Sequence, residues 1–401
     1  TGLYPAPSHT FILREVAALR RRGLDIRTAT VRRPTEADLL GPEERAEHAA
    51  TFPVLPAAKN PFRLLSDHVA AFLRAPGRYA GALALALRTA RPGLKGGLWQ
   101  LFYFAEAAIV ARHMARIGAA QIHSHFAASN ASLAMIAAHM AGRPFSFTLH
   151  GPADLLEPIA FRLDAKIARA RSVACISHYA RAQAMFLSDR AHWHKLAIVR
   201  CGVEPARYAP APPPRHDGLD LLFVGRVTAI KGLFVALEAL SMLSDLRVRL
   251  SVIGDGPDRS ALEAEARARD LDVAFLGFRS QSEVAEAMAE ADAVILPSFG
   301  EGLPVVLMEA LATARPVIAT RVAAVEELVE AGASGLVVPP GDAQALAAAI
   351  RQLAETPAET RTEMGRRGRA RVEAEFDIDL QAERLDALFA PAGRRTQDRS
   401  T

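Results

Sequence analysis

The second half of the chain alternates short apolar runs with amphipathic segments, and this rhythm restricts the folds that the chain can adopt. The apolar runs cover residues 219–225, 248–254, 273–277, 293–297, 316–320 and 335–339. Segments with helical periodicity lie between them at 231–243, 258–269, 281–291, 303–313, 323–331 and 342–355, with Asp342 as the expected N-cap of the last. Strands that are apolar on both faces are typical of parallel sheets covered by helices on both sides. The sequence therefore predicts an α/β fold with a doubly wound parallel sheet.

The first half repeats this rhythm less regularly, which predicts a second domain of the same kind. Its candidate strands are 26–31, 121–125, 145–150, 172–177 and 196–201. A proline-rich stretch at 209–218 fits neither a helix nor a central strand, so it predicts an interdomain linker. The domains expected from these signals are an N-terminal domain at 1–205, a C-terminal domain at 206–375, a terminal helix at 376–391 that packs back towards the N-terminal domain, and a flexible tail at 392–401.

The charge of the chain is unevenly distributed. Residues 1–205 hold 26 Lys and Arg against 14 Asp and Glu, a net charge of +12, whereas residues 206–401 hold 22 against 30, a net charge of −8. A positive half favours an anionic partner such as a membrane surface, a phosphorylated substrate or nucleic acid. Nucleic acid fits least well, because aromatic residues make up 6% of the chain and no recognition motif accompanies the arginines.

Residues 61–118 interrupt the strand-helix rhythm with two or three helices rich in alanine and leucine. These helices carry eight Lys and Arg against Asp67 and Glu106. They could form a basic amphipathic surface that binds a membrane, or they could be ordinary helices with one face packed on a core and the other face solvated. The sequence leaves both interpretations open.

Cysteine content and hydropathy point to the cytoplasm. The two cysteines, Cys175 and Cys201, cannot form a disulfide scaffold, and no apolar run approaches the roughly 20 residues of a membrane-spanning helix. We expect a cytoplasmic protein that could make peripheral contact with the inner face of the membrane. The chain starts abruptly at Thr1, as though an opening strand lay upstream.

Two cations flank a tight turn after the first strand of the second half. Residues 225–232 read GRVTAIKG, which places Arg226 and Lys231 before a helix, where paired cations and free N–H groups suit a diphosphate. A turn with solvated charges is the alternative. The glycine-rich turn at 254–259 does not match a dinucleotide fingerprint, because Arg259 stands where the third glycine belongs.

The segment 298–309, SFGEGLPVVLME, is the most informative part of the sequence. A strand ends before it, a glycine-bracketed loop holds Glu301, and a helix is expected to open near Leu303 or Pro304, with the N–H groups of Gly302 and Leu303 facing a ligand. Glu309 follows in an otherwise apolar helix, where a buried carboxylate is costly without a hydrogen-bonding partner such as a ribose diol. The alternative is a solvated glutamate on the helix surface.

Together these segments resemble the GT-B retaining glycosyltransferases of family 4. The resemblance rests on the E-x7-E pair Glu301 and Glu309, on the upstream cations, and on PVIAT at 316–320 and GLVVPPGD at 335–342. The first half is similar to the exopolysaccharide and colanic-acid branch at 4–12, 123–127, 148–151 and 199–204. The resemblance implies two Rossmann-like domains facing each other across a cleft. It also implies retaining sugar transfer from a nucleoside-diphosphate sugar to the hydroxyl of a lipid-linked or polysaccharide acceptor.

The resemblance also assigns roles to individual residues. Arg226 and Lys231 would clamp the diphosphate, Glu309 would bind the ribose and Glu301 the donor sugar. The donor-binding residues expected with them are Gly225, Gly277, Phe278, Arg279, Gly302, Leu303 and Pro304, and the catalytic set is His150, Glu301, Arg226 and Lys231. His150 would face the transferred sugar, with Ser8, His9, Thr10 and His125 on the acceptor side. A packed histidine is the alternative for His150, and structural roles are favoured for His123 and His125.

The chain departs from the branch at two loops. His9 stands where the branch usually has Glu, and Ala323 and Ala324 stand where two glycines are frequent.

No nucleophile with a paired base is evident in the sequence, which favours same-face attack without a covalent intermediate. No metal is expected, because the two Asp-x-Asp triplets at 270–272 and 377–379 do not follow strands. A sugar-nucleotide epimerase and a catalytically inactive membrane-associated scaffold are the alternative functions.

Overall fold

The computed structural model describes residues 1–401 except 7–8, 37–38, 40, 152–153, 156, 160, 211–216 and 391–401. The chain forms two compact units, which are described separately below. Unit 1 comprises Thr1–Arg200 and Arg384–Thr401, and unit 2 comprises Cys201–Glu383. Part of the expected linker and the whole of the expected tail at 392–401 lie outside the described residues.

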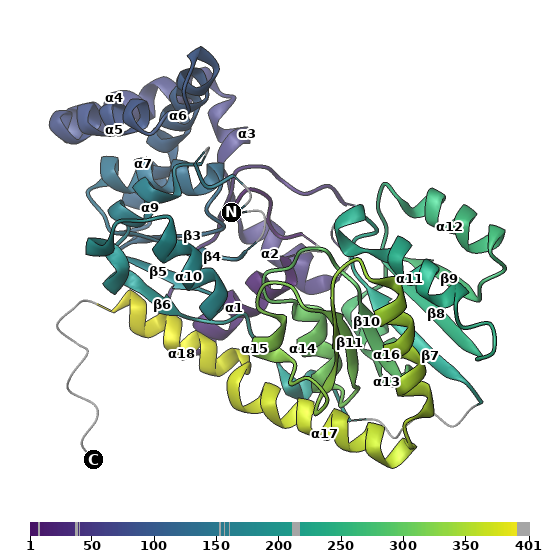
Figure 1. Ribbon diagram of the computed structural model, residues 1–401. Coiled ribbons are helices and arrows are strands. Elements are labelled where there is room, and N and C mark those ends of the chain that lie inside the picture. Colours follow the sequence, from purple (N-terminus) through teal and green to yellow (C-terminus); the bar gives the residue numbers. More distant parts are fainter. Residues whose placement is uncertain are drawn as a thin grey trace, which may run out of the picture. The chain divides into compact units, whose positions relative to one another are not determined.

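Unit 2 is built on a six-stranded parallel sheet (Figure 1). Its strands are β7 (Leu219–Val224), β8 (Val248–Ile253), β9 (Val273–Gly277), β10 (Ala293–Leu296), β11 (Val317–Thr320) and β12 (Gly335–Val338). Their order in the sheet is β12-β11-β10-β7-β8-β9. Every residue of β10 and β11 is buried, as expected for strands covered on both faces. The strands predicted in this half all form, each within one residue of the predicted bounds.

Helices connect the strands of unit 2. They are α11 (Leu233–Ser241), α12 (Arg259–Ala268), α13 (Gln281–Glu290), α14 (Val305–Ala312), α15 (Val325–Leu328), α16 (Ala343–Glu355) and α17 (Ala358–Glu375), and the short 3-10 turns η4 (Pro205–Arg207) and η5 (Ala229–Lys231) precede β7 and α11. Asp342 caps α16 as predicted, since its side chain accepts a hydrogen bond from the N–H of Ala345 at 2.8 Å.

Unit 1 contains a four-stranded parallel sheet in the order β3-β4-β5-β6 and a separate parallel pair, β1 and β2. The strands are β1 (Ala29–Thr30), β2 (Phe52–Pro53), β3 (Ile122–His125), β4 (Phe145–Leu149), β5 (Ser172–Cys175) and β6 (Leu196–Ile198). The helices are α1 (Thr10–Arg21), α2 (Pro42–Ala50), α3 (Val54–Ala58), α4 (Pro61–Arg74), α5 (Pro76–Arg88), α6 (Leu94–Arg116), α7 (Ser129–Ala141), α9 (Leu163–Arg169) and α10 (His178–Phe186), with the 3-10 turn η3 (Arg190–Lys195). The strand predicted at 26–31 shrinks to two residues, because only Ala29 and Thr30 find pairing partners, Phe52 and Pro53.

The interrupting segment at 61–118 forms the three helices α4, α5 and α6. Their inner faces share a core with α7 in which Phe104, Ala108 and Ile136 are buried. Within the described residues, no helix combines the length and the apolarity needed to cross a membrane.

The last helix, α18 (Ile378–Phe389), passes from unit 2 into unit 1 at Arg384. Its final turn contacts unit 1 through side chains: the Phe389 ring lies 5.1 Å from the ring of His123, and Asp386 lies 3.5 Å from Arg22. The C-terminal residues of the described chain therefore complete the unit formed by the N-terminal residues.

Lys166 of α9 is fully buried beneath the loop that follows β3. Its Nζ donates to the carbonyl oxygens of Ala127, Ala128 and Phe161 at 2.5, 2.9 and 2.6 Å. Burial lowers the pKa of Lys166 from 10.5 to about 7. The Lys166 side chain thus supplies a buried donor to three carbonyl oxygens, of which that of Ala128 also accepts from the N–H groups of Ala131 and Ser132.

We expect Lys166→Met to lower the free energy of unfolding by about 2–4 kcal/mol, because it removes the buried hydrogen bonds that Lys166 donates to these carbonyls. Urea denaturation near neutral pH measures the difference, with the exposed Lys59→Met as the matched control that leaves stability unchanged. The folded pKa of Lys166 lies below its unfolded value, so the wild-type protein gains stability from this group as the pH rises from about 7 towards 10.5. Equal midpoints for Lys166→Met and Lys59→Met would contradict this role.

Candidate functional site

The loops that follow β7 and β10 meet at the carboxyl edge of the sheet of unit 2. These strands are neighbours in the sheet, so the residues after them lie close together. Lys231 Nζ lies 2.6 Å from Glu301 Oε1, and the hydroxyl of Ser298 donates to the same oxygen at 2.6 Å. The predicted cation and the predicted carboxylate are thus held as a largely buried ion pair.

Glycines permit this close approach of the loops. Gly232 has a positive φ of 69°, and a Cβ at this position would lie 2.0 Å from the carbonyl oxygen of Pro297. Gly254, with φ at 129°, and Gly256 pass equally close to the loop after β7, where a Cβ would meet Gly225 O and Val227 O at 1.9 and 2.2 Å. The glycine-rich turn at 254–259 therefore serves backbone packing against the cation loop.

Arg226 is exposed to solvent and precedes Lys231 in the sequence, in the loop that begins at Gly225. The backbone of this loop is fixed by two hydrogen bonds to the turn after β8, from Gly225 N to Ile253 O and from Val227 N to Asp255 O, both at 3.0 Å. A fixed loop that carries an exposed guanidinium and leads to Lys231 along the chain is suited to binding an anion.

The helix after Glu301 begins later than predicted. Pro304 is the N-cap of α14, so the first free helical N–H groups belong to Val305 and Val306 rather than to Gly302 and Leu303. Gly302 lies in the loop before the helix, where its carbonyl oxygen accepts a hydrogen bond from the N–H of Ala324 at 3.3 Å. Proline at the cap accounts for the shift, because the preceding residue is biased away from helical geometry.

Glu309 is buried in α14 and has a protein partner that the sequence did not indicate. The hydroxyl of Tyr208 donates to Glu309 Oε1 at 2.9 Å. The buried carboxylate is therefore stabilised within unit 2 itself, and ribose binding by Glu309 stays a prediction.

The predicted donor-binding residues Gly277, Phe278 and Arg279 lie further along the same sheet edge. Gly277, with φ at 70°, ends β9, the outermost strand, and its carbonyl accepts from Gly254 N at 2.8 Å. Phe278 is 54% exposed, and exposed Arg279 lies 3.8 Å from Glu283. The structure thus brings Lys231 and Glu301 together and leaves Phe278 and Arg279 two strands away from β7.

In unit 1 the ends of β3 and β4 bring His125 and His150 together. His125 Nδ1 lies 3.0 Å from His150 Nε2, and His125 Nε2 lies 3.3 Å from Glu15 Oε1 of α1. If the Glu15 carboxylate accepts from His125 Nε2–H, then His125 Nδ1 accepts from His150 Nε2–H, and His150 Nδ1 is left as an acceptor. Burial, followed by the nearby His125, lowers the pKa of His150 well below its usual range, so its ring is neutral.

Aromatic rings and a buried aspartate fix the position of His150. Its ring centre lies 4.9 Å from that of Phe11 and 4.8 Å from that of Phe126. Asp154 accepts from the N–H of His150 at 3.0 Å and from that of Ala127 at 2.7 Å, and burial raises the pKa of Asp154 to about 6. This aspartate joins the loops after β3 and β4.

The remaining acceptor-side predictions fall near the same place. His9 Nδ1 lies 3.0 Å from Leu3 O, and its ring centre lies 5.1 Å from that of Phe126. Thr10 is the first residue of α1. Ser8 lies outside the described residues.

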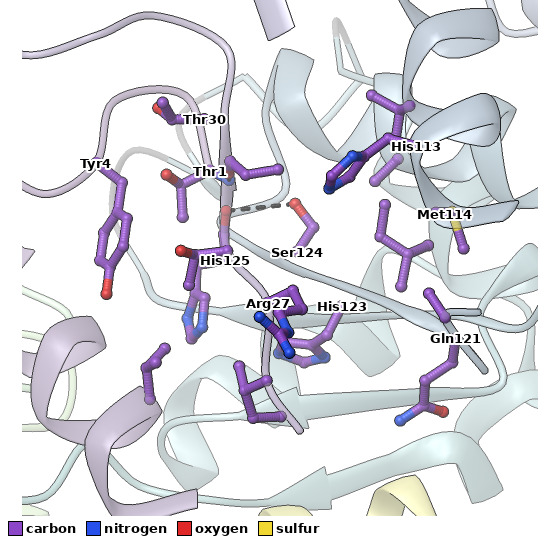
Figure 2. A pocket seen from close by; sticks show the side chains of 18 of the residues that line it. Thr1, Tyr4, Arg27, Thr30, His113, Met114, Gln121, His123, Ser124 and His125 are labelled. Carbon is purple, nitrogen blue, oxygen red and sulfur yellow. Dashed lines mark hydrogen bonds between the residues drawn. The ribbon is translucent and has the colours of Figure 1, made fainter. Parts of the chain in front are cut away.

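A cavity of about 480 Å³ lies beside β3 and is lined by every residue of this strand (Figure 2). Residues of the β1 region, such as Thr30, line it together with Ser124 and His125 of β3. Glu15, His123 and His125 lie beside it, with possible metal-ligand atoms all within 4.8 Å of one another. However, both ring nitrogens of His123 lie 2.9 Å from hydroxyls, those of Ser146 and Thr148. Protein hydrogen bonds thus account for this cluster, and the expectation that no metal is needed stays a prediction.

Sequence reasoning missed Glu15, Asp154 and Tyr208. Glu15 carried a usable signal, because it is a carboxylate inside an apolar helical stripe, the same feature that singled out Glu309. Asp154 and Tyr208 carried none, since their partners are set by the folded chain.

The chain is similar in sequence to known glycosyltransferases. Residues 208–371 match the family described as glycosyl transferases group 1. The amylovoran biosynthesis glycosyltransferase AmsK of Erwinia amylovora is 36% identical over 206 residues, which is 49% of this chain and 50% of AmsK. The putative colanic acid biosynthesis glycosyltransferase WcaL of Escherichia coli is 35% identical over 206 residues, covering 49% of this chain and 51% of WcaL. The chain thus spans about half the length of the curated relatives it matches.

A solved structure resembles the chain over almost its full length. Anabaena HepE in complex with UDP-glucose superposes with a TM-score of 0.72 at 19% identity and covers 96% of each chain. This likeness establishes the fold, two Rossmann-like units of GT-B type, as predicted. The family match lies within unit 2, at residues 208–371, so the similarity to the glycosyl transferases group 1 family extends over less than half of the chain.

Proposed function

We propose that the protein is a retaining glycosyltransferase that transfers a sugar from a nucleoside-diphosphate sugar to an acceptor hydroxyl in exopolysaccharide synthesis. The observation that carries the proposal is the pairing of Lys231 with Glu301 at the carboxyl edge of the sheet of unit 2, where the loop before Lys231 also carries the exposed Arg226. The cations would stabilise the charge that develops on the departing diphosphate, where electrostatic stabilisation contributes most to catalysis.

Glu301 fits a role in binding the donor sugar better than a role as a nucleophile. Its Oε1 already accepts hydrogen bonds from Lys231 and Ser298, so the carboxylate is fixed and its charge is compensated. A carboxylate held in this way can accept from a sugar hydroxyl, whereas a nucleophile requires a free, activated oxygen. This arrangement supports the proposal of same-face attack by the acceptor with retention of configuration, rather than a covalent intermediate.

The names of the relatives and the charge of unit 1 support the choice of substrates. AmsK and WcaL are named for exopolysaccharides, and the HepE structure is named as a complex with UDP-glucose. We propose a uridine-type sugar nucleotide as the donor and a lipid-linked or polysaccharide acceptor, used at the inner face of the cytoplasmic membrane. Neither a metal nor another cofactor takes part in this proposal.

The test is to incubate the full chain with radiolabelled sugar nucleotides, with and without a lipid-linked oligosaccharide fraction, and to determine the anomeric configuration of the product. Transfer with retention, only in the presence of acceptor, supports the proposal. Epimerised donor without acceptor would identify an epimerase, and absence of nucleotide binding would identify an inactive scaffold.

We expect donor binding to be independent of divalent cations. Arg226, Lys231 and the N–H groups at the start of α14 supply the positive potential that a metal ion would otherwise provide. Calorimetric titration with UDP should therefore give the same dissociation constant, within about twofold, before and after treatment with a chelator. Loss of binding on chelation would refute the metal-free site.

A further inference from the structure

Two helices of unit 1 expose large apolar side chains in stripes. On α4 these are Phe62, Leu65, Val69, Phe72 and Leu73, and on α6 they are Leu94, Leu98, Trp99, Leu101 and Phe102. The spacings follow helical periodicity, so each set lies along one side of its helix. Phe62 is 84% exposed and Leu94 is 97% exposed. We call these ten residues the apolar face.

The other sides of the same helices are already used for folding. His68 of α4 lies 5.5 Å from the ring of Phe104 of α6, and Phe104 is part of the buried core. The apolar face is therefore surplus to the packing of unit 1, and soluble proteins rarely leave so large an apolar surface uncovered without a function.

The two stripes approach each other at one end of the helical group. Arg63 lies over the ring of Phe52, which stacks on His113 near the end of α6, whereas His68, one turn further along α4, faces Phe104. The helices are therefore antiparallel. Consequently Phe72 and Leu73 at the end of α4 lie towards the first turns of α6, which carry the second stripe.

The charge around the apolar face is positive. Residues 59–102 contain seven Lys and Arg and one acid, Asp67. Asp67 is buried and lies within 4 Å of Arg63, Arg112 and Arg116. Arg74, Arg78, Arg88 and Lys95 are exposed. This surface therefore presents positive charges to solvent, and these charges alternate with aromatic and aliphatic side chains.

We infer that the apolar face inserts into the interfacial region of a bilayer that contains anionic phospholipid. Leucine and aromatic side chains of an interfacial helix enter the headgroup boundary, and Lys and Arg bind the lipid phosphates. A second copy of this chain fits less well, since the same cations would face each other. The inference deepens the proposed function, on which it rests for the position of a lipid-linked acceptor.

Vesicle sedimentation of the full chain tests the inference directly. We expect binding to phosphatidylcholine vesicles that contain phosphatidylglycerol, at least about tenfold weaker binding to phosphatidylcholine alone, and weaker binding at high salt. Phe62→Glu with Leu73→Glu, and separately Leu94→Glu with Phe102→Glu, should each weaken binding about tenfold or more. The matched control is Phe186→Glu, since Phe186 of α10 is 83% exposed outside the apolar face.

Trp99 provides a second readout that folding defects do not imitate. The chain has only one other tryptophan, Trp193, so Trp193→Phe isolates the emission of Trp99. We expect this emission to shift to shorter wavelength on addition of anionic vesicles and to be quenched by brominated lipid.

Activity on a water-soluble acceptor separates this inference from the proposed function. Variants that lose vesicle binding but retain this activity support the inference, whereas a wild-type protein that binds vesicles without transferase activity leaves the docking surface intact and refutes only the proposed function. No vesicle binding at low salt, equal loss in Phe186→Glu, or a dimer that the glutamate variants abolish in the absence of vesicle binding would overturn the inference.

Discussion

Lys231→Ala should weaken binding of the nucleoside diphosphate by roughly ten- to a hundredfold. A charge-assisted hydrogen bond to phosphate contributes about 1.5–3 kcal/mol, and each 1.4 kcal/mol corresponds to about tenfold in affinity. The ion pair with Glu301 holds the Lys231 ammonium in place before the donor binds, so little side-chain entropy is lost on binding. Calorimetric titration with UDP measures the effect.

A second effect of this substitution must be separated from the first. Removing Lys231 also leaves the buried Glu301 carboxylate with an uncompensated charge, which repels the diphosphate. The double variant Lys231→Ala with Glu301→Gln removes this repulsion, so it should recover part of the affinity but not all of it. Arg351→Ala, which breaks an exposed ion pair with Asp245, is the matched control and should bind as the wild type does. Unchanged binding in Lys231→Ala would rule out the proposed diphosphate site.

His150→Ala should lower turnover about a hundredfold while changing the dissociation constant of UDP less than about threefold. A hydrogen-bonding group that acts only in the transition state affects turnover rather than ground-state binding. His150 belongs to unit 1, whereas the UDP-binding residues proposed here belong to unit 2, so its loss leaves the nucleotide contacts intact. Steady-state kinetics and calorimetry on the same preparation measure both quantities.

Two controls distinguish chemistry from packing at this position. His150→Phe fills the space between Phe11 and Phe126 without ring nitrogens, so it should be as slow as His150→Ala, and the exposed His194→Ala should be as fast as the wild type. Because burial keeps the pKa of His150 well below its usual range, its ring stays neutral between about pH 6 and pH 8, and turnover should show no loss from its protonation there. Wild-type turnover in His150→Phe would make the residue structural.

The sheet of unit 2 could be predicted from the sequence because its strands are apolar on both faces. Runs such as 293–297 and 316–320 are bounded by proline, glycine or charge, and the folded strands β10 and β11 are fully buried. The strand predicted at 26–31 was too long, since a strand needs partners and only Ala29 and Thr30 have them. Apolar patterning reports burial, whereas pairing depends on residues far away in the chain.

The candidate site was predicted only in part, for the same reason. Glu301 and Lys231 could be named from their loops, and their neighbouring strands bring them together. The start of α14 was predicted slightly too early, before its N-cap Pro304. The partner of Glu309 could not be predicted, because Tyr208 lies 101 positions away in sequence and its contact exists only after folding. The separation of Phe278 from the cation loop follows from the strand order, which local sequence does not encode.

The course of α18 determines how the two units could be exchanged between proteins. Unit 1 is discontinuous in sequence: its first 200 residues lack the Phe389 ring that lies against His123 and the Asp386 carboxylate that lies beside Arg22. A chimera that exchanges unit 2 as a simple C-terminal fusion would replace this last turn with a foreign one and remove both contacts. Unit 2 should therefore be exchanged as an internal cassette, with one junction at 200/201 and the other inside α18 at 383/384, so that the native final turn remains with unit 1.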